Sequence, residues 1–257
     1  MEPEALHNHD EILALSTIAQ VTPEISLDVR ELMTLMQEYR AAIREVKTKF
    51  EILDEDARTR MLHSPIHQIS ARLKTPTSLI EKIRRKNIPL TIAGIREQVY
   101  DVAGVRVVCH YLSDVEAVAE EFLRQDDVQL VDRRDYIANP KESGYRSLHI
   151  IVKVPVFLND MRRLVNVEVQ IRTIAMDFWA SLEHRLRYKN QSVLDANKAE
   201  IKKIRARLVS CADQIASIDQ AMQQIQIEID KLSGPEANDS LDFDAEEFIR
   251  RFSSIRM

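Results

Sequence analysis

The sequence is poor in glycine and cysteine. Only four glycines occur in 257 residues, and three of them lie in the middle of the chain, where tight turns or close approaches to the backbone are expected. The two cysteines, Cys109 and Cys211, are far apart and each sits in an apolar pattern. This number and spacing exclude a disulfide framework and a zinc site. We expect both cysteines to be small core residues.

Long apolar runs and a secretory leader are also missing. No run approaches the roughly 20 apolar residues that a membrane-spanning helix needs. The first residues, MEPEALHNHDEILAL, are acidic and have no basic segment before an apolar one, which argues against a signal peptide. With 45% hydrophobic and 30% charged residues, the composition is that of a globular protein. We therefore expect a cytoplasmic protein with no membrane partner.

Positive charge is scarce overall but concentrated in one place. The net charge of −5 is unlike that of a generic nucleic-acid binder. The stretch RLKTPTSLIEKIRRK, from Arg72 to Lys86, nevertheless carries six basic residues against one acidic residue. A solvated helix face would explain such a run. A basic island on an acidic protein also suits a small polyanion better than a long one.

Three regions differ in their hydrophobic pattern. Residues 1–60 predict a helical extension, because apolar side chains recur at close to helical spacing from Leu27 to Ile43. Residues 191–257 carry an unbroken a/d heptad seam from Ile201 to Leu232, which requires a covering helix from this chain or from another subunit.

The middle region, residues 61–190, mixes helices and strands. Its patterns predict helices over 77–87, over 113–125 and from about 174, and strands near 101–111, 127–133, 147–155 and 163–172. We expect an α+β fold in which helices flank a mixed β-sheet, with helical regions at both ends of the chain.

Polar residues alternate with apolar ones in two of these strands. In LVNVEVQIRT, Glu168 and Gln170 fall on the face opposite the valines, and in YRSLHIIVKV His149 does the same. An exposed outer strand would also alternate, so this pattern leaves open whether the polar face is solvated or forms the floor of a cleft.

A second carboxylate, Asp101, stands at the start of the strand YDVAGVRVVC. Two carboxylates brought together from distant strands are suited to Mg²⁺, which takes hard oxygen ligands and usually adds substrate phosphates to them. Side chains alternate between the two faces of a strand, so Asp101 and Arg106, five residues apart, would point to opposite faces. Both can serve one site only if Asp101 lies just outside the strand or if Gly104 marks a bulge.

Four ordered stretches carry a resemblance to a known family. RLKTPTSLIEKIRRKN, YDVAGVRVVC, DYIANPKESGYRSLHIIVKV and VEVQIRTIAMDFWASLEHRLRYK follow one another in the order and at about the spacing of the synthetase domain of the stringent-response Rel/SpoT enzymes. The match covers roughly residues 60 to 190, and the chain resembles a small alarmone synthetase. The resemblance implies a nucleotidyltransferase-like sheet. It also implies transfer of the β,γ-diphosphate of ATP to the 3′-hydroxyl of GDP or GTP, which makes ppGpp or pppGpp.

The resemblance assigns roles on the ATP side. Arg72 and Arg106 would sandwich the adenine by guanidinium stacking. The ATP phosphates would be lined by Lys74, Ser78 and Lys82.

The carboxylates take the central roles in this resemblance. Asp101 would hold Mg²⁺, and Glu168 would share the metal or take the proton from the attacking hydroxyl. Gly144 would let the base reach the residue that follows it.

The acceptor side would be built mainly from the third stretch. Tyr145 would stack on guanine, and Gln170 would help to orient the acceptor. The acceptor's phosphates or ribose would be contacted by Lys141 and His149, with Arg134 as a further phosphate contact.

Partners and alternatives follow from the same resemblance. Small alarmone synthetases are typically homotetramers, so we expect a homotetramer with room for an allosteric nucleotide at a subunit interface. A His9–Asp10 pair occurs, but too little chain precedes it for a hydrolase domain. Two other classes stay open: an RNA- or nucleotide-binding regulator with a decayed site, and an oligomeric scaffold built on the heptad seam.

Overall fold

The computed structural model describes residues 29–61, 64–159, 161–189 and 198–233. The His9–Asp10 pair and residues 234–257 lie outside these ranges. No helix in the described ranges is both long and apolar enough to cross a bilayer. The chain divides into two compact units, residues 1–219 and residues 220–257.

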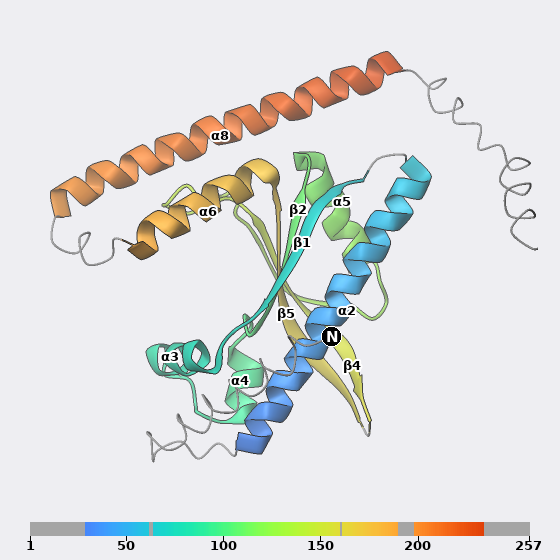
Figure 1. Cartoon of the computed structure of the whole chain (residues 1–257), viewed down its shortest axis with the longest axis vertical. Coiled ribbons are helices and arrows are strands. Elements are labelled where there is room, and N and C mark those ends of the chain that lie inside the picture. The colour runs from blue at the N-terminus through green and yellow to red at the C-terminus, as the bar shows by residue number, and fades with distance from the viewer. Residues whose placement is uncertain (1–28, 62–63, 160, 190–197, 234–257) are drawn as a thin grey trace, which may run out of the picture. The chain divides into compact units, whose positions relative to one another are not determined.

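A single five-stranded sheet forms the centre of the first unit (Figure 1). Its strand order is β1-β2-β5-β4-β3. The pair β2–β5 is parallel, and the other three pairs are antiparallel. The sheet is therefore mixed, and the predicted α+β class is confirmed. The strands are β1 (Ile66–Leu73), β2 (Ala103–Cys109), β3 (Gln129–Asp135), β4 (Leu148–Leu158) and β5 (Met161–Thr173).

Six helices are described along the chain. They are α2 (Val29–Met61), α3 (Pro76–Lys86), α4 (Ile92–Gln98), α5 (Leu112–Leu123), α6 (Ile174–Lys189) and α8 (Lys198–Ser233). The expected helices over 77–87 and 113–125 match α3 and α5 closely. Two elements, β1 and α4, had no counterpart in the sequence prediction.

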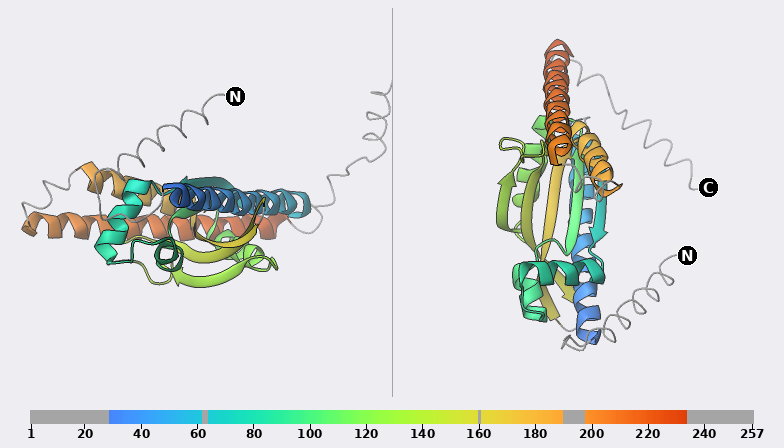
Figure 2. Two further views of the ribbon diagram at one scale, coloured as in Figure 1. Left: turned by 90° about the horizontal axis from the view of Figure 1, so that it is seen from below. Right: turned by 90° about the vertical axis from the view of Figure 1, so that its left-hand side faces the viewer.

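The apolar face of the sheet is covered by α2 and α5 (Figure 2). Alternating strand residues such as Val107, Val152 and Val169 are fully buried against the apolar stripes of these helices. The rings of Phe50 and Phe122 stack there with their centroids 4.3 Å apart. Full burial of one such side chain stabilises the fold by about 1.5–3 kcal/mol, so α2 is an integral part of this core.

The seam on α8 is largely exposed within the described chain. Ile218 is 61% exposed and Ile225 is 47% exposed. The apolar face of α2 is already buried in the core, so α2 is not available to cover the seam. The expectation that both cysteines are core residues is half wrong: Cys109 is buried, but Cys211 on α8 is exposed. The a/d position of Cys211 predicted burial against a covering helix, and no helix in the described ranges covers it.

Candidate active site

Two rows of side chains cross the polar face of the sheet. In register, Arg106 on β2 lies beside Gln170 on β5, which lies beside His149 on β4, and Arg134 on β3 follows His149. Glu168 lies in the neighbouring row, beside Gly104. Because residues in register on adjacent strands point to the same face, these distant residues share one surface.

Asp101 reaches this surface from outside the strand. Strand β2 begins at Ala103, and its pairing with β1 and β5 shows no register shift at Gly104. Of the two ways in which Asp101 and Arg106 could serve one site, the structure therefore has the first. No bulge is needed.

Two lysines neutralise Asp101. Lys82 Nζ lies 2.6 Å from Asp101 Oδ1, and Lys74 Nζ lies 3.2 Å from Asp101 Oδ2. Burial alone would raise the pKa of Asp101, but the hydrogen bonds and charges of Lys82 and Lys74 outweigh it and hold that pKa below its ordinary value. The carboxylate is therefore ionised at neutral pH.

Glu168 is held by different partners. Gln170 Nε2 donates to Glu168 Oε2 at 3.0 Å, and His149 Nδ1 lies 3.6 Å from Glu168 Oε1. Burial would raise the pKa of Glu168, yet the pKa is lowered by His149 and by the hydrogen bond from Gln170, while the charge of Asp101 acts in the opposite direction. The two carboxylates are thus close enough to influence each other and are both ionised.

The start of α3 adds a phosphate-sized polar surface. Thr75 caps the helix, accepting from the Ser78 backbone N–H at 3.3 Å, and Pro76 occupies the first turn, where a missing N–H costs nothing. Ser78 and Lys82 are four residues apart and therefore share one side of α3. A helix N-terminus with free N–H groups and an adjacent lysine favours an anion.

Arg72 and Arg106 lie on neighbouring strands of the same face. Arg72 is in register with Gly104, and its side chain passes over that glycine, since a Cβ built on Gly104 would lie 3.6 Å from Arg72 Cγ. Arg106 Nη1 lies 3.6 Å from Asp177 Oδ1. Both arginine side chains therefore leave the same face of the β1–β2 pair, two residues apart in register.

Asp177 on α6 also pairs with a buried arginine. Its Oδ1 lies 2.7 Å from Nη2 of Arg172, whose side chain is only 3% exposed. Burial and the nearby charge of Arg106 lower the pKa of Arg172. Asp177 therefore offsets two positive charges at the edge of the site.

Aromatic side chains gather at the other end of the polar face. Tyr145 Oη and His149 Nε2 are 2.9 Å apart, and the ring of Tyr136 lies edge-on to both, at centroid distances of 6.3 Å and 5.1 Å. Lys141 Nζ lies 4.3 Å from the centroid of Tyr136 and 4.8 Å from that of Tyr145. The cluster offers ring faces and a cation to a planar, charged ligand.

Gly144 contacts α8, and Arg134 lies at the rim of the polar face. Gly144 has a φ of +86°, which favours glycine, but a Cβ placed there would lie 2.6 Å from Ala212 Cβ. On the side where a Cβ would stand, the close approach to Gly144 is therefore made by α8, and access of the base beside this glycine stays a prediction. Arg134 is 61% exposed and pairs with Asp132 at 2.7 Å, at the rim of the polar face.

The chain is similar to the proteins of one known family. The sequence pattern described as "Region found in RelA / SpoT proteins" matches residues 71–193. GTP pyrophosphokinase YwaC of Bacillus subtilis is 37% identical over 192 residues, which cover 75% of this chain and 89% of the relative. GTP pyrophosphokinase YjbM of the same organism is 36% identical over 203 residues, which cover 79% and 92%. The chain belongs to the RelA/SpoT synthetase family, among its small alarmone synthetases.

Solved structures of small alarmone synthetases share the fold. The chain aligns with small alarmone synthetase 1 of Bacillus subtilis, bound to its product pppGpp, with a TM-score of 0.67 and 34% identity over 78% of this chain and 99% of the other. A GTP pyrophosphokinase family protein of Streptococcus pneumoniae aligns with a TM-score of 0.69 and 33% identity over 79% and 96%. The mixed sheet with its flanking helices is thus the sheet of small alarmone synthetases.

Sequence reasoning missed two residues that contact this candidate site, Tyr136 and Asp177. Tyr136 lies between the third strand and the loop, where a lone tyrosine gives no periodic signal. Asp177 stands in the first turn of a helix, where an acidic residue is expected for the helix dipole alone. The signal that could have pointed to Asp177 is that Arg106 and Arg172, on two strands of the polar face, need a nearby carboxylate to offset their charge.

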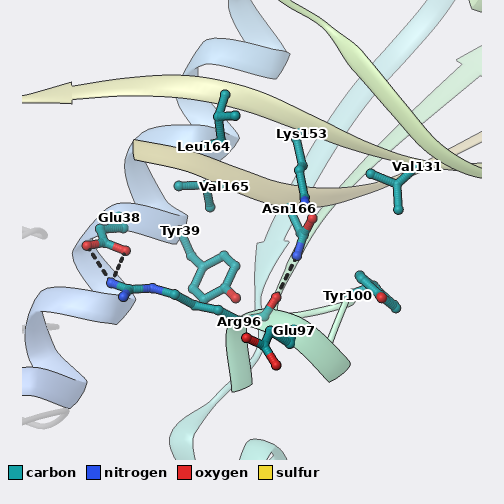
Figure 3. A pocket seen from close by; sticks show the side chains of 10 residues that line it. All are labelled: Glu38, Tyr39, Arg96, Glu97, Tyr100, Val131, Lys153, Leu164, Val165 and Asn166. Carbon is teal, nitrogen blue, oxygen red and sulfur yellow. Dashed lines mark hydrogen bonds and ion pairs between the residues drawn. The ribbon is translucent and has the colours of Figure 1, made fainter. Parts of the chain in front are cut away.

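A cavity of about 260 Å³ opens beside this site of the synthetase, between α2, α4 and the strands β4 and β5 (Figure 3). It contains none of the predicted site residues. Its wall holds a bidentate ion pair, in which Arg96 Nη2 lies 2.8 Å and 2.7 Å from the oxygens of Glu38, and Asn166 Nδ2 donates to Arg96 O at 2.8 Å. These contacts tie α2 and β5 to α4, which ends shortly before Asp101.

Proposed function

We propose that this chain transfers the β,γ-diphosphate of ATP to the 3′-hydroxyl of GDP or GTP, forming ppGpp or pppGpp and releasing AMP. One observation carries the proposal: two ionised carboxylates, Asp101 and Glu168, stand between a group of cationic side chains and a group of aromatic ones. Small alarmone synthetase 1 of Bacillus subtilis has been solved with pppGpp and with AMPCPP, which supports nucleotides as the ligands of the two groups.

The cationic half is proposed to hold ATP. Lys74, Lys82 and the N-terminus of α3 present positive charge to the phosphates, which is what phosphoryl chemistry requires most. Arg72 and Arg106 would lie against the two faces of the adenine ring, because a planar guanidinium stacks on an aromatic face. Ser78 adds a hydroxyl donor beside the phosphates.

Mg²⁺ fits the carboxylates of the site. In the described ranges no group of three or more acidic, histidine or cysteine side chains could hold a metal by itself. Two carboxylates completed by substrate phosphates are, however, the usual protein environment of Mg²⁺. Asp101 and Glu168 would hold it, and the bound ion would supply neutralisation of the charge that develops on the migrating phosphates.

The aromatic half is proposed to hold the acceptor. Tyr145 would stack on the guanine, while Lys141, His149 and the rim residue Arg134 would contact its phosphates or ribose. Gln170 lies between His149 and Arg106 in register and would orient the acceptor toward ATP.

The transfer balances as one displacement at phosphorus. The oxygen of the acceptor 3′-hydroxyl bonds to the β-phosphorus of ATP, and the bond from that phosphorus to the oxygen bridging to the α-phosphate breaks. AMP leaves with the electron pair of the broken bond, and the hydroxyl proton is released. Glu168 stands on the acceptor side, where a carboxylate that stays ionised can align the hydroxyl by accepting its hydrogen bond.

We further propose that the enzyme works as a cytoplasmic homotetramer with room for an allosteric nucleotide between subunits. The exposed seam on α8 supports the oligomer, because monomers rarely expose a continuous apolar stripe of this length. The cytoplasm is proposed because it holds both nucleotide substrates.

The proposed function is tested with ATP labelled in the γ-phosphate. Purified protein is incubated with labelled ATP, Mg²⁺ and either GDP or GTP, and the nucleotides are separated. We expect the label in a product that carries a 3′-diphosphate, with AMP formed in equal amount. Formation of ADP in place of AMP, or no transfer to either acceptor, would contradict the proposal.

A further inference from the structure

The loop that presents the aromatic cluster rests on α8. We call residues 136–147 the acceptor loop. Inside it, Gly144 packs so closely on α8 that an added Cβ would lie 2.6 Å from Ala212 Cβ and 3.4 Å from Val209 Cα. Real Cβ atoms do not approach each other so closely, so neither partner has room for another methyl group.

An arginine in the same loop forms an ion pair with the same helix. Arg146 Nη2 lies 3.0 Å from Asp213 Oδ1 on α8, and Arg146 Nη1 donates to Ile137 O at 3.2 Å. One guanidinium thus joins the beginning of the acceptor loop, its end and α8. The residues on both sides of Tyr145 therefore contact consecutive residues of one helix, Ala212 and Asp213.

Tyr145 itself packs against the buried residues that join α6 to α8. Trp179, Ala180 and Ala212 are buried together, and Tyr145 packs against them. Trp179 Nε1 donates to Leu208 O of α8 at 3.3 Å.

Further along α8, the buried Asp219 accepts from Thr173 Oγ1 at 2.6 Å. Thr173 is the last residue of β5. The middle of α8, from Leu208 to Asp219, is thus held at several separate points beside the candidate site.

We propose that Ala212 and Asp213 are positioning residues for the acceptor nucleotide. They set the ring of Tyr145, through Gly144 and Arg146, without touching the nucleotide themselves. The inference rests on the proposed function, because it assumes that Tyr145 binds the acceptor. Displacements of about 1 Å in groups that position a substrate change rates strongly, so a helix that fixes the loop on both sides of the ring controls acceptor binding.

The first test enlarges the contact at position 212. Ala212→Val is compared with Ala206→Val, which makes the same substitution at an exposed position of the same helix. We expect Ala212→Val to raise the KM for GDP by about fivefold or more, as overpacking of a closed contact predicts. The KM for ATP should stay within about twofold, and Ala206→Val should match the wild type in both constants.

The second test removes charge without adding bulk. Asp213→Asn should raise the KM for GDP by about two- to fivefold, since half-exposed ion pairs are weak, and the difference from wild type should shrink in high salt. Asp213→Glu should restore most of the loss. Asp230→Asn, at an exposed position of the same helix, serves as the control.

The outcomes separate the inference from the function on which it rests. If wild-type protein makes no product, the proposed function fails. If wild type is active but Ala212→Val and Asp213→Asn behave like their controls, the positioning role is wrong. Equal increases in the KM for ATP and for GDP, together with a lower melting temperature, would show that these residues only stabilise the fold.

Discussion

Single side chains decide the charge at the centre of the candidate site. Asp101, just before β2, and Glu168, on β5, share no hydrogen-bond partner in the described contacts, and both are ionised. Asp101→Ala and Glu168→Ala should each lower the transfer rate by more than about hundredfold, a loss of about 3 kcal/mol of transition-state stabilisation. The fold should persist, because both side chains lie at a cleft, and circular dichroism checks this.

An exposed carboxylate provides the control for this prediction. Asp56 on α2 is half exposed and pairs with Arg60 of the same helix at 2.9 Å, so Asp56→Ala should leave the rate unchanged. A rate above about a tenth of wild type in either Asp101→Ala or Glu168→Ala would remove that residue from the centre of the reaction.

The lowered pKa of Asp101 makes a prediction about acid stability. A carboxyl group whose pKa is lower in the folded protein stabilises the fold fully above its unfolded pKa and loses this contribution as the pH falls through the folded pKa. Wild type should therefore melt at a higher temperature than Asp101→Asn at pH 7, where Lys74 and Lys82 lose their counter-charge. The difference should stay constant down to about pH 5 and shrink below pH 4. A difference that already declines between pH 7 and pH 6 would contradict the lowered pKa.

Tyr145 offers a separate test of the acceptor half. Tyr145→Ala should weaken GDP binding by about 1–3 kcal/mol, the value of one base stack on an aromatic side chain, with ATP binding little changed. Tyr145→Phe keeps the ring and removes the hydroxyl with its contact to His149, so its effect should be smaller. Separate calorimetric titrations of GDP and ATP measure both. Equal losses for the two nucleotides would mean that Tyr145 is structural.

At the scale of elements, α4 is positioned by a buried charge. Glu38 is 2% exposed and holds Arg96, whose backbone carbonyl in turn binds Asn166. Glu38→Ala would leave Arg96 without its carboxylate, and we expect a loss of about 3 kcal/mol in the free energy of unfolding. Urea denaturation measures it, with Glu45→Ala on the exposed side of α2 as the control. Equal losses of unfolding free energy in both variants would mean that the Glu38–Arg96 pair adds nothing to stability.

The sequence predicted the elements whose patterns are regular. Strands β2, β4 and β5 were found because apolar residues alternate along them. Strand β1 was missed because IHQISARL is an edge strand in which polar and apolar residues do not alternate regularly and only Ile66 is buried. Helix α4 was missed because seven residues with a glycine inside give too little helical period. Pattern reasoning detects burial, and these two elements bury little.

The candidate site was partly predictable for a related reason. The alternation in β5 placed Glu168 and Gln170 on one face, which the structure has. Strand parity alone could not place Asp101, because its position depends on where β2 begins. The contacts of Gly144 with Ala212 join residues far apart in the chain, and no local pattern contains such information.

At the scale of the whole molecule, the seam on α8 predicts self-association. Burying a charge without a partner costs several kcal/mol, so Ile218→Glu combined with Ile225→Glu should dissociate the oligomer. Ile215 is avoided, because it packs against the Trp179 cluster. Gln214→Glu with Gln220→Glu adds the same charge at exposed polar positions and should leave the assembly intact. Light scattering decides between them, and a monomeric wild type at micromolar concentration would refute the prediction.

The two cysteines of the chain differ in a way that experiments can use. Burial raises the pKa of the Cys109 thiol, which keeps it in the unreactive protonated form, whereas Cys211 is exposed. A maleimide fluorophore should therefore label one position when the seam on α8 is uncovered, directly before Ala212 in the chain. The natural sequence thus provides an attachment point for a spectroscopic label beside the contact between α8 and the acceptor loop.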